Sequence, residues 1–331
     1  MVHPEILQNR YALGFLPTPI QKLERFTQES APYSLYVKRD DQTGLATGGN
    51  KTRKLEYLVK EALNFNCDTL ITAGAQQSNH CRQTAAAAAQ LGLECHLLLG
   101  GTKPNSYSGN LLLSQLLGAK IHFTGADRKG EQLTKVKNTL EVNGKQCYII
   151  PYGGSNLIGA LGFVNAIAEL KQQEQVLSIE FDHIVFASSS GGTQAGMILG
   201  KELFGLKAQL HPISIDKEGI SGQDLDTTVL DLVNAGAKKL RLTRSFSIEE
   251  CRLNKNFESP GYGVLTKSEI SSIKFLAANE GILLDPVYTG RAFSALRSMI
   301  NNQVFAPKSK ILFWHTGGTP AIFSKSGMLL A

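Results

Sequence analysis

Segments typical of buried strands alternate with segments of helical periodicity along most of the chain. Strands are predicted at 34–39, 69–74, 95–99, 120–124, 147–150, 183–187, 211–215 and 311–315. Helices are predicted at 51–63, 79–91, 109–117, 131–142, 157–172, 225–234 and 267–279, and a further helix is predicted to follow SSSGGTQAG and to end at 204. Because short strands separated by helices form parallel βαβ units, the pattern predicts an α/β fold with two doubly wound, mostly parallel-sheet domains. The polar stretch KQQEQ at 171–175 is the best candidate for a passage between them.

The stretch GLATGGNKTRKLEYLVK at 44–60 joins a glycine-rich loop to an amphipathic helix. The apolar residues recur at helical spacing and predict one buried face, formed by Leu55, Leu58, Val59, Ala62 and Leu63. Asn50 is the expected N-cap, which places Lys51 in the first turn. A lysine ammonium there is unfavourable by roughly 0.3–1 kcal/mol, because the positive end of the helix dipole repels it.

Three explanations compete for Lys51. It is a solvated surface lysine, part of a phosphate-binding loop, or a lysine whose lowered pKa lets it form a Schiff base with an aldehyde. The phosphate-loop pattern GxxxxGK[ST] is missed by one residue, because Asn50 separates Gly49 from Lys51. This matters because backbone N–H groups converge on a phosphate only at a fixed loop length.

Composition and charge narrow the class of protein. Hydrophobic residues make up 42% and charged residues 19% of the 331 residues, as in a soluble globular protein long enough for two cores. The net charge of +6 is scattered, which argues against nucleic-acid binding and is compatible with an anionic small molecule as partner. No apolar run approaches the roughly 18 residues of a membrane span, so we expect a cytoplasmic protein without a membrane partner. Five cysteines without a CxxC pair support neither a disulfide framework nor a metal site, and predict mostly buried thiols.

Four loops are expected at the carboxyl ends of strands, where α/β proteins bind ligands: 48–51, 76–80, 188–193 and 315–319. The segment SSSGGTQAG combines hydroxyls and glycines directly before a helix, which suits a phosphate, although a tight turn is the alternative. It lacks the GxGxxG spacing of a dinucleotide fold. The amides and hydroxyl of QQSNH suit a carboxylate, and a helix N-cap at Ser78 or Asn79 is the alternative.

Several motifs in one order resemble a known family. They are GGNKTRKLEYL (48–58), AGAQQSNHCRQTAAAAAQLG (73–92), GGTQAGM (191–197), GYG (261–263), DPVYTG (285–290) and HTGGTPA (315–321). Over nearly its whole length the chain resembles the pyridoxal-phosphate enzymes of the tryptophan synthase β-subunit fold type. Within them it resembles the group containing D-cysteine desulfhydrase and 1-aminocyclopropane-1-carboxylate deaminase. The resemblance implies fold type II, with pyridoxal 5'-phosphate between a larger domain (1–52 and 160–331) and a smaller one (53–159), and suggests a homodimer.

The resemblance also implies roles for individual residues. Lys51 would carry the cofactor and act as the base at the substrate α-carbon. Around the cofactor we expect Asn79 at the ring hydroxyl, Ser190, Gly191, Gly192 and Thr193 at the phosphate, and Thr289 and Thr316 near the pyridine ring. At the substrate carboxylate we expect Ser78 with Gln77, Asn79 and His80. Tyr262 and Tyr288 would face the substrate as acid, base or positioning groups, the alternatives being a loop aromatic and a core aromatic.

The implied reaction is a β-elimination that converts D-cysteine to pyruvate, ammonia and hydrogen sulfide. By the resemblance, the deaminases have a glutamate at the position of Thr289 and a leucine at the position of Thr316. A threonine hydroxyl, unlike a glutamate, cannot keep the pyridine nitrogen protonated, which opening the cyclopropane ring would require. The deaminase and a lyase acting on cysteate remain alternatives within the family. Outside it stand a nucleotide-binding ATPase, with Asp216 as a possible magnesium ligand, and a non-catalytic amino-acid-binding protein, which would have no need of Lys51.

Overall fold

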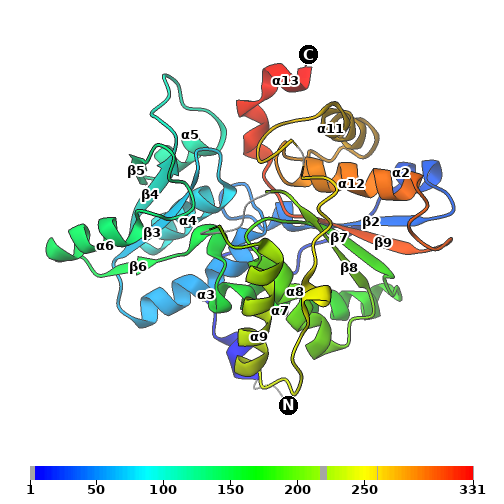
Figure 1. The fold of residues 1–331 in the computed structure, drawn as a ribbon, viewed down its shortest axis with the longest axis horizontal. Helices are drawn as coiled ribbons and strands as arrows, with labels where there is room; N and C mark the ends of the chain where they lie inside the picture. The colour runs from blue at the N-terminus through cyan, green and yellow to red at the C-terminus, as the bar shows by residue number, and fades with distance from the viewer. Residues whose placement is uncertain (1–3, 217–221, 259, 331) are drawn as a thin grey trace.

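The computed structural model describes residues 4–216, 222–258 and 260–330, and its strands form two sheets (Figure 1). The larger sheet has the order β1-β2-β9-β7-β8, with β1 at Ile20–Lys22, β2 at Ser34–Arg39, β9 at Lys310–His315, β7 at His183–Ser188 and β8 at Gln209–Ser214. The smaller sheet has the order β5-β4-β3-β6, with β5 at Lys120–Phe123, β4 at Glu94–Gly100, β3 at Thr69–Ala75 and β6 at Cys147–Ile149. Only β1 and β2 pair antiparallel among the described strands, which confirms the predicted mostly parallel α/β fold.

Helices cover both faces of the larger sheet because its strands alternate between two apolar faces. Val185 and Phe313 face a core shared with α2 (Glu24–Glu29), α11 (Lys267–Glu280) and α12 (Thr289–Asn301). Phe186 and Trp314, their neighbours in sequence, face a core shared with α7 (Leu157–Leu177) and α8 (Gly192–Phe204). Helix α9 (Leu225–Lys239) packs on α8. This two-sided burial is what a doubly wound sheet requires.

The smaller sheet is covered in the same way. Leu70 and Leu97 face a core built with α3 (Lys51–Asn64), α4 (Asn79–Leu91) and α5 (Gly109–Leu116). Ile71 and Leu98 face the opposite side, where α6 (Leu133–Val142) packs. The remaining described elements are α1 (Pro4–Gln8), α10 (Ile248–Cys251), α13 (Ser326–Leu330) and the 3-10 turns η1 (Asp40–Gln42), η2 (Tyr152–Gly154) and η4 (Thr319–Ser324).

The structure corrects three expectations. Residues 171–175 are not a linker, because they continue α7, the long helix that itself joins β6 of the smaller sheet to β7 of the larger one. Helix α12 was not predicted, although it covers the larger sheet. Helix α3 buries residues 52–59 on all sides rather than along one face, because it lies between α4 and α7.

The proposed domain division places each sheet in one domain. Its two boundaries, 52/53 and 159/160, fall in the first turns of α3 and α7. The two helices pack against each other, so we propose that they form the joint between the domains.

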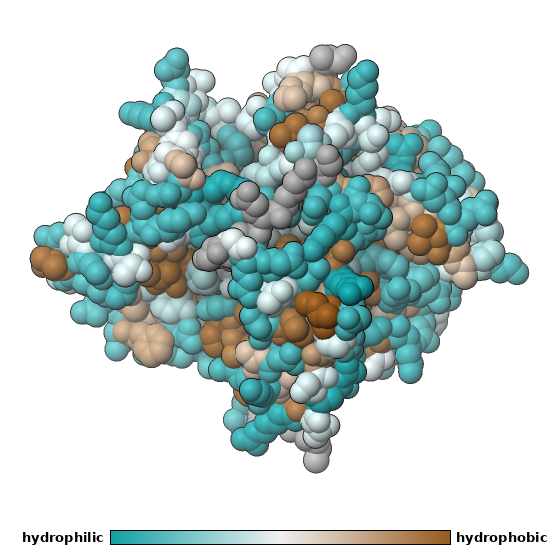
Figure 2. All heavy atoms as spheres, viewed as in Figure 1, coloured by the Kyte–Doolittle hydropathy of each residue, from teal (hydrophilic) through white to brown (hydrophobic). Residues whose placement is uncertain are grey.

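The surface and the cysteine thiols add little to this description of the fold. The face in Figure 2 is mostly hydrophilic, with hydrophobic residues in small groups. All five cysteines are free, and four are buried. In the part of the chain that the structure describes, no helix has both the length and the apolar character needed to cross a membrane.

Candidate active site

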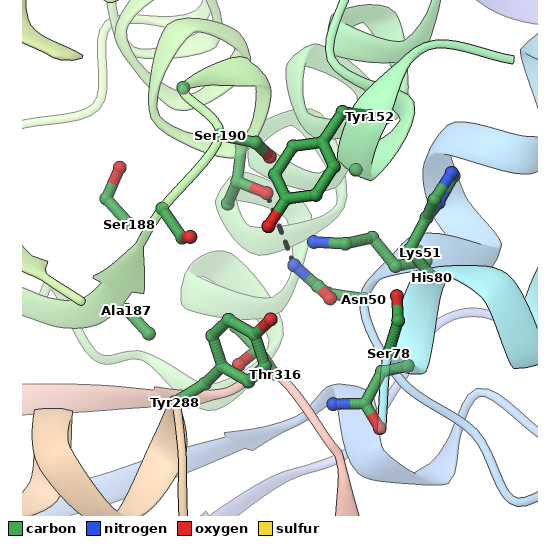
Figure 3. A pocket seen from close by; sticks show the side chains of 15 residues that line it. Asn50, Lys51, Ser78, His80, Tyr152, Ala187, Ser188, Ser190, Tyr288 and Thr316 are labelled. Carbon is green, nitrogen blue, oxygen red and sulfur yellow. Dashed lines mark hydrogen bonds between the residues drawn. The ribbon is translucent and has the colours of Figure 1, made fainter. Parts of the chain in front are cut away.

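A pocket lies where loops from both sheets meet (Figure 3). It is lined by Asn50, Lys51, Ser78, Asn79, His80, Tyr152, Gly153, Ala187, Ser188, Ser189, Ser190, Gly191, Thr193, Tyr288 and Thr316. The loops that follow β3, β7 and β9 therefore converge, as expected for the carboxyl ends of parallel strands.

Lys51 begins α3 and extends its amine into this pocket (Figure 3). Burial lowers the pKa of Lys51 to about 8, and the charge of Asp285 opposes part of that shift. Asn50 occupies the predicted N-cap position, but its side chain does not cap the helix. Its amide instead donates to Thr193 Oγ1 at 3.2 Å, which ties the start of α3 to the start of α8.

The loop before Lys51 is held in an unusual backbone conformation. Thr47, Gly48 and Gly49 all have positive φ angles, of 71°, 72° and 129°. Arg82 on α4 donates to Thr47 Oγ1 and to Gly48 O, both at 2.7 Å. A side chain at residue 49 would not fit, because a Cβ there would lie 2.3 Å from the Gln83 amide nitrogen. The glycines thus allow α4 to approach the loop and set where α3 begins.

The start of α4 offers donors for a carboxylate. Ser78 is the N-cap, and its Oγ accepts from the Cys81 N–H at 3.2 Å, so the capping alternative holds. The Ser78 hydroxyl also hydrogen-bonds the Cys81 thiol, which offsets part of the rise that burial causes in the pKa of Cys81. The backbone N–H groups of Asn79 and His80 have no hydrogen-bond partner among the described residues. Free N–H groups at the positive end of a 13-residue helix form an anion site.

The start of α8 is the second helix N-terminus that lies at the pocket. Gly191 precedes the helix with φ 82°, a conformation suited to glycine. Ser155 Oγ lies 2.7 Å from Ser190 Oγ and accepts from the Gly192 N–H at 3.2 Å. The side chain of Lys54 donates to the same Ser155 oxygen and to Gly153 O, both at 3.1 Å.

Lys54 is a cation that sequence reasoning missed. Its side chain is fully buried and forms no ion pair with a described acidic residue. Burial, and then the nearby charge of Lys51, lowers the pKa of Lys54 well below its ordinary value. A bound anion would relieve both costs. The sequence spacing could have indicated Lys54 as a site residue, because residues three positions apart, such as 51 and 54, lie on the same side of a helix.

Two tyrosines line the pocket, and a third contacts one of them from outside the lining. Tyr288 lines it, and its hydroxyl lies 2.7 Å from that of Tyr262, which stands behind it. Burial raises the pKa of Tyr262 to about 12 and that of Tyr288 well above its ordinary value, so both hydroxyls remain protonated near neutral pH. Tyr152 also lines the pocket and was not expected there. Arg128 stacks 4.6 Å from the centre of the Tyr262 ring.

Two expected site residues point elsewhere. The Gln77 amide accepts from the Asn110 N–H at 2.9 Å and donates to Ser108 O at 3.1 Å, so it holds α5 rather than lining the pocket. The Thr289 hydroxyl donates to Asp285 Oδ1 at 2.7 Å and accepts from the Asp285 N–H at 2.7 Å. Both side chains are occupied, and neither lines the pocket. The structure thus places neither side chain in the pocket lining, and the contacts of Gln77 with the substrate and of Thr289 with the cofactor ring stay predictions.

His80 lines the pocket as a neutral side chain. Thr72 donates its hydroxyl proton to Ile150 O at 2.7 Å, so His80 Nε2, at 2.8 Å, donates to the Thr72 oxygen. Burial, with the charges of Lys51 and Lys54, lowers the pKa of His80 well below its ordinary value. His80 is thus no cationic partner for a substrate carboxylate. Gly192 and Tyr262 are also outside the lining, although Gly191 and Thr193 on either side of Gly192 belong to it and Tyr262 contacts the lining residue Tyr288.

A buried lysine of low pKa beside two helix N-termini, in a two-sheet α/β fold, is the arrangement of an enzyme that binds an aldehyde cofactor bearing a phosphate. The profile of the family described as pyridoxal-phosphate dependent enzyme matches residues 11–317. The chain belongs to this family, and its cofactor is pyridoxal 5'-phosphate.

Solved structures agree with this assignment. A structure described as an ACC deaminase homologue is 35% identical, with a TM-score of 0.89 and coverage of 99% of both chains. A pyridoxal 5'-phosphate-dependent aspartate racemase is 16% identical, with a TM-score of 0.66 over 96% of this chain and 95% of that one. Isoform 2 of threonine deaminase from Solanum lycopersicum is 15% identical, with a TM-score of 0.67 over 99% of this chain and 88% of that one. At this low identity, the racemase and the threonine deaminase show only that they share the fold of this chain.

Proposed function

We propose that this enzyme is a carbon–sulfur lyase that converts D-cysteine and water to pyruvate, ammonia and hydrogen sulfide. The observation that carries the proposal is the lining of the pocket, which contains Thr316 and no aspartate or glutamate among the described residues. Without a carboxylate beside it, the pyridine nitrogen of the cofactor would stay neutral and would withdraw electrons only weakly. A thiolate leaves readily once the α-proton is gone, whereas opening a cyclopropane ring needs a stronger electron sink. The preference for the D enantiomer rests on the family resemblance.

The described residues fit the cofactor. We assign its attachment to Lys51, its phosphate to the start of α8 together with Lys54, and its ring hydroxyl to Asn79. The buried amine of Lys54, which lacks an acidic partner among described residues, supports the phosphate assignment. When bound, the cofactor supplies an electron sink for the negative charge that develops at the substrate α-carbon.

The remaining chemistry belongs to this chain's side chains. The Ser78 hydroxyl and the free N–H groups at the start of α4 hold the substrate carboxylate. Lys51 Nζ takes the α-proton, which requires a neutral amine, and its pKa of about 8 provides one in mildly alkaline solution. The Tyr288 hydroxyl, kept protonated and hydrogen-bonded to Tyr262, is a proton donor for the departing sulfur.

A second candidate is 1-aminocyclopropane-1-carboxylate deaminase. It is favoured by the description of the 35% identical structure as an ACC deaminase homologue. The pocket lining argues against the deaminase, because it contains no aspartate or glutamate among the described residues. A lyase that releases sulfite from cysteate would need the same carboxylate site and differs in the charge of its leaving group.

Parallel assays of the purified holoenzyme test the proposal. We expect sulfide and pyruvate from D-cysteine, less from L-cysteine, and little 2-oxobutyrate from 1-aminocyclopropane-1-carboxylate. Brisk 2-oxobutyrate production without sulfide release would overturn it in favour of the deaminase, and sulfite from cysteate alone would overturn it in favour of the third reaction. Lys51→Ala should abolish turnover and the visible absorbance of the bound cofactor. Lys51→Arg should not restore them, because a guanidinium stays protonated.

A further inference from the structure

Asn110, the second residue of α5, is buried beside the pocket and has no assigned role. Its side-chain nitrogen donates to Gln77 O at 2.9 Å and to Asn79 Oδ1 at 2.8 Å. Its backbone N–H donates to the Gln77 side-chain oxygen at 2.9 Å. Three hydrogen bonds thus hold Asn110 against the loop that carries the predicted carboxylate and cofactor contacts.

These contacts determine which way the Asn79 amide faces. A backbone carbonyl only accepts, so the group of Asn110 facing Gln77 O is its NH₂. The second hydrogen of that NH₂ goes to Asn79, whose facing atom is therefore the oxygen. The Asn79 nitrogen remains, and it has no acceptor among the described residues although Asn79 lines the pocket. The side opposite Asn110 is kept open by Gly318, where a Cβ would lie 2.7 Å from this nitrogen.

We propose that Asn110 is a positioning residue that fixes the Asn79 amide with its N–H groups toward the cofactor ring. The proposal rests on the assignment of Asn79 to the ring hydroxyl. In its ionised form that oxygen only accepts, so it is stabilised by a donor and repelled by a carbonyl oxygen. An Asn79 amide turned by 180° would present the wrong atom, and packing alone would not prevent the turn, because the two orientations have nearly the same shape.

Asn110→Asp tests the proposal, because a carboxylate has the shape of the amide but no donor for Asn79. The Asn79 amide should then turn its nitrogen toward Asp and its oxygen toward the cofactor. We expect apoprotein titrated with pyridoxal 5'-phosphate to show at least a tenfold weaker Kd, since a hydrogen bond to a charged group is lost. The absorption maximum of the bound cofactor should shift, which a general loss of stability would not cause.

A double-mutant cycle shows whether Asn110 acts through Asn79. Asn79→Ala should weaken cofactor binding, and adding Asn110→Asp to it should weaken binding no further. Asn110→Ala removes the donor without adding a charge, so it should have a smaller effect and serves in the same cycle if the aspartate variant does not fold. The matched control is Asn234→Asp on α9, which loses a comparable amide contact to Phe246 far from the pocket and should leave Kd unchanged.

The outcomes separate this proposal from the proposed function. The positioning role would be overturned if Asn110→Asp kept the wild-type Kd and absorption spectrum. It would also be overturned if Asn110→Asp weakened cofactor binding equally in the wild type and in Asn79→Ala. Unchanged binding by Asn79→Ala would overturn the assignment on which it rests. Absence of sulfide release with the expected Kd values would reject the proposed reaction and support the positioning role.

Discussion

Lys51 and Lys54 are two amines on one side of α3, and burial lowers the pKa of both. They differ in their partners. Lys54 is held by Gly153 O and Ser155 Oγ, beside the proposed phosphate site. Lys51 forms no hydrogen bond with a described side chain and extends into the pocket. The same helix therefore presents one amine anchored beside the proposed phosphate site and one amine that extends freely into the pocket.

The low pKa of Lys51 predicts a pH-dependent stability of the apoprotein. Below pH 8 the amine is charged in both native and unfolded chains, and the native state carries the full cost of the buried charge. Between its native pKa of about 8 and its ordinary value of 10.5, the native state releases the proton and the unfolded state keeps it, so stability rises with pH.

We therefore expect the unfolding free energy of wild type, relative to Lys51→Met, to rise by roughly 1–3 kcal/mol between pH 8 and pH 10. Urea titrations of both apoproteins at several pH values measure it. A difference that does not change with pH would show that Lys51 is solvated.

At the scale of the element, α3 is fixed in place by a buried ionic cluster. Arg53 donates to both oxygens of Asp40 at 2.8 Å and to both oxygens of Glu169 on α7 at 2.9 Å. Asp40 also accepts from the Trp314 indole of β9 at 2.8 Å. Burial alone would raise the pKa of Glu169, but Arg53 and Lys38 lower it to about 2. The helix that carries Lys51 is thus bound to the larger sheet and to α7 through one guanidinium.

Arg53→Met should lower the unfolding free energy by about 3–5 kcal/mol, because it leaves Asp40 buried without its cation. Chemical denaturation of the apoprotein measures this loss. Lys120→Met is the control, since its partner Glu94 and Lys120 itself are partly exposed and such pairs contribute about 1 kcal/mol or less. Equal effects of the two substitutions would contradict the importance of the buried cluster.

At the scale of the whole molecule, the pocket depends on how the two sheets are held together. Arg128, in the loop after β5 of the smaller sheet, pairs with Asp216, after β8 of the larger one, at 2.9 Å. The same guanidinium stacks on Tyr262, whose hydroxyl contacts Tyr288 in the pocket wall. A second contact joins α5 to η4. These links cross from one sheet to the other beside the site.

Arg128→Ala should increase hydrogen exchange in the loop at 124–130 by several-fold, because a partly exposed ion pair holds a local structure by about 1 kcal/mol or less. The loss is limited, because Lys129 also lies 3.7 Å from Asp216. The exchanged pair Arg128→Asp with Asp216→Arg should restore protection. Mass spectrometry of the apoprotein follows both, and unchanged exchange in Arg128→Ala would show that the contact does not hold the loop.

The local sequence pattern was sufficient to predict most helices and strands and several residues that line the pocket. The bounds of α4 were predicted at both ends, because Ser78 caps it and Gly92 ends it in the left-handed conformation. Lys51 was found because a cation in a first helical turn conflicts with the helix dipole. The order of the motifs indicated a pyridoxal-phosphate enzyme, which the family match confirms.

The tertiary structure alone decided which side chains of those loops reach the pocket. Thr289 and Gln77 stand in the expected motifs, yet Asp285 and Asn110 take up their hydrogen bonds. Arg53 and Glu169 are 116 positions apart, and their contact exists because α3 packs on α7. Hydrophobic periodicity is a local property that determines helices, strands and the loops between them. A polar side chain takes the partners that packing brings to it from distant segments, so its role is determined only when the chain is folded.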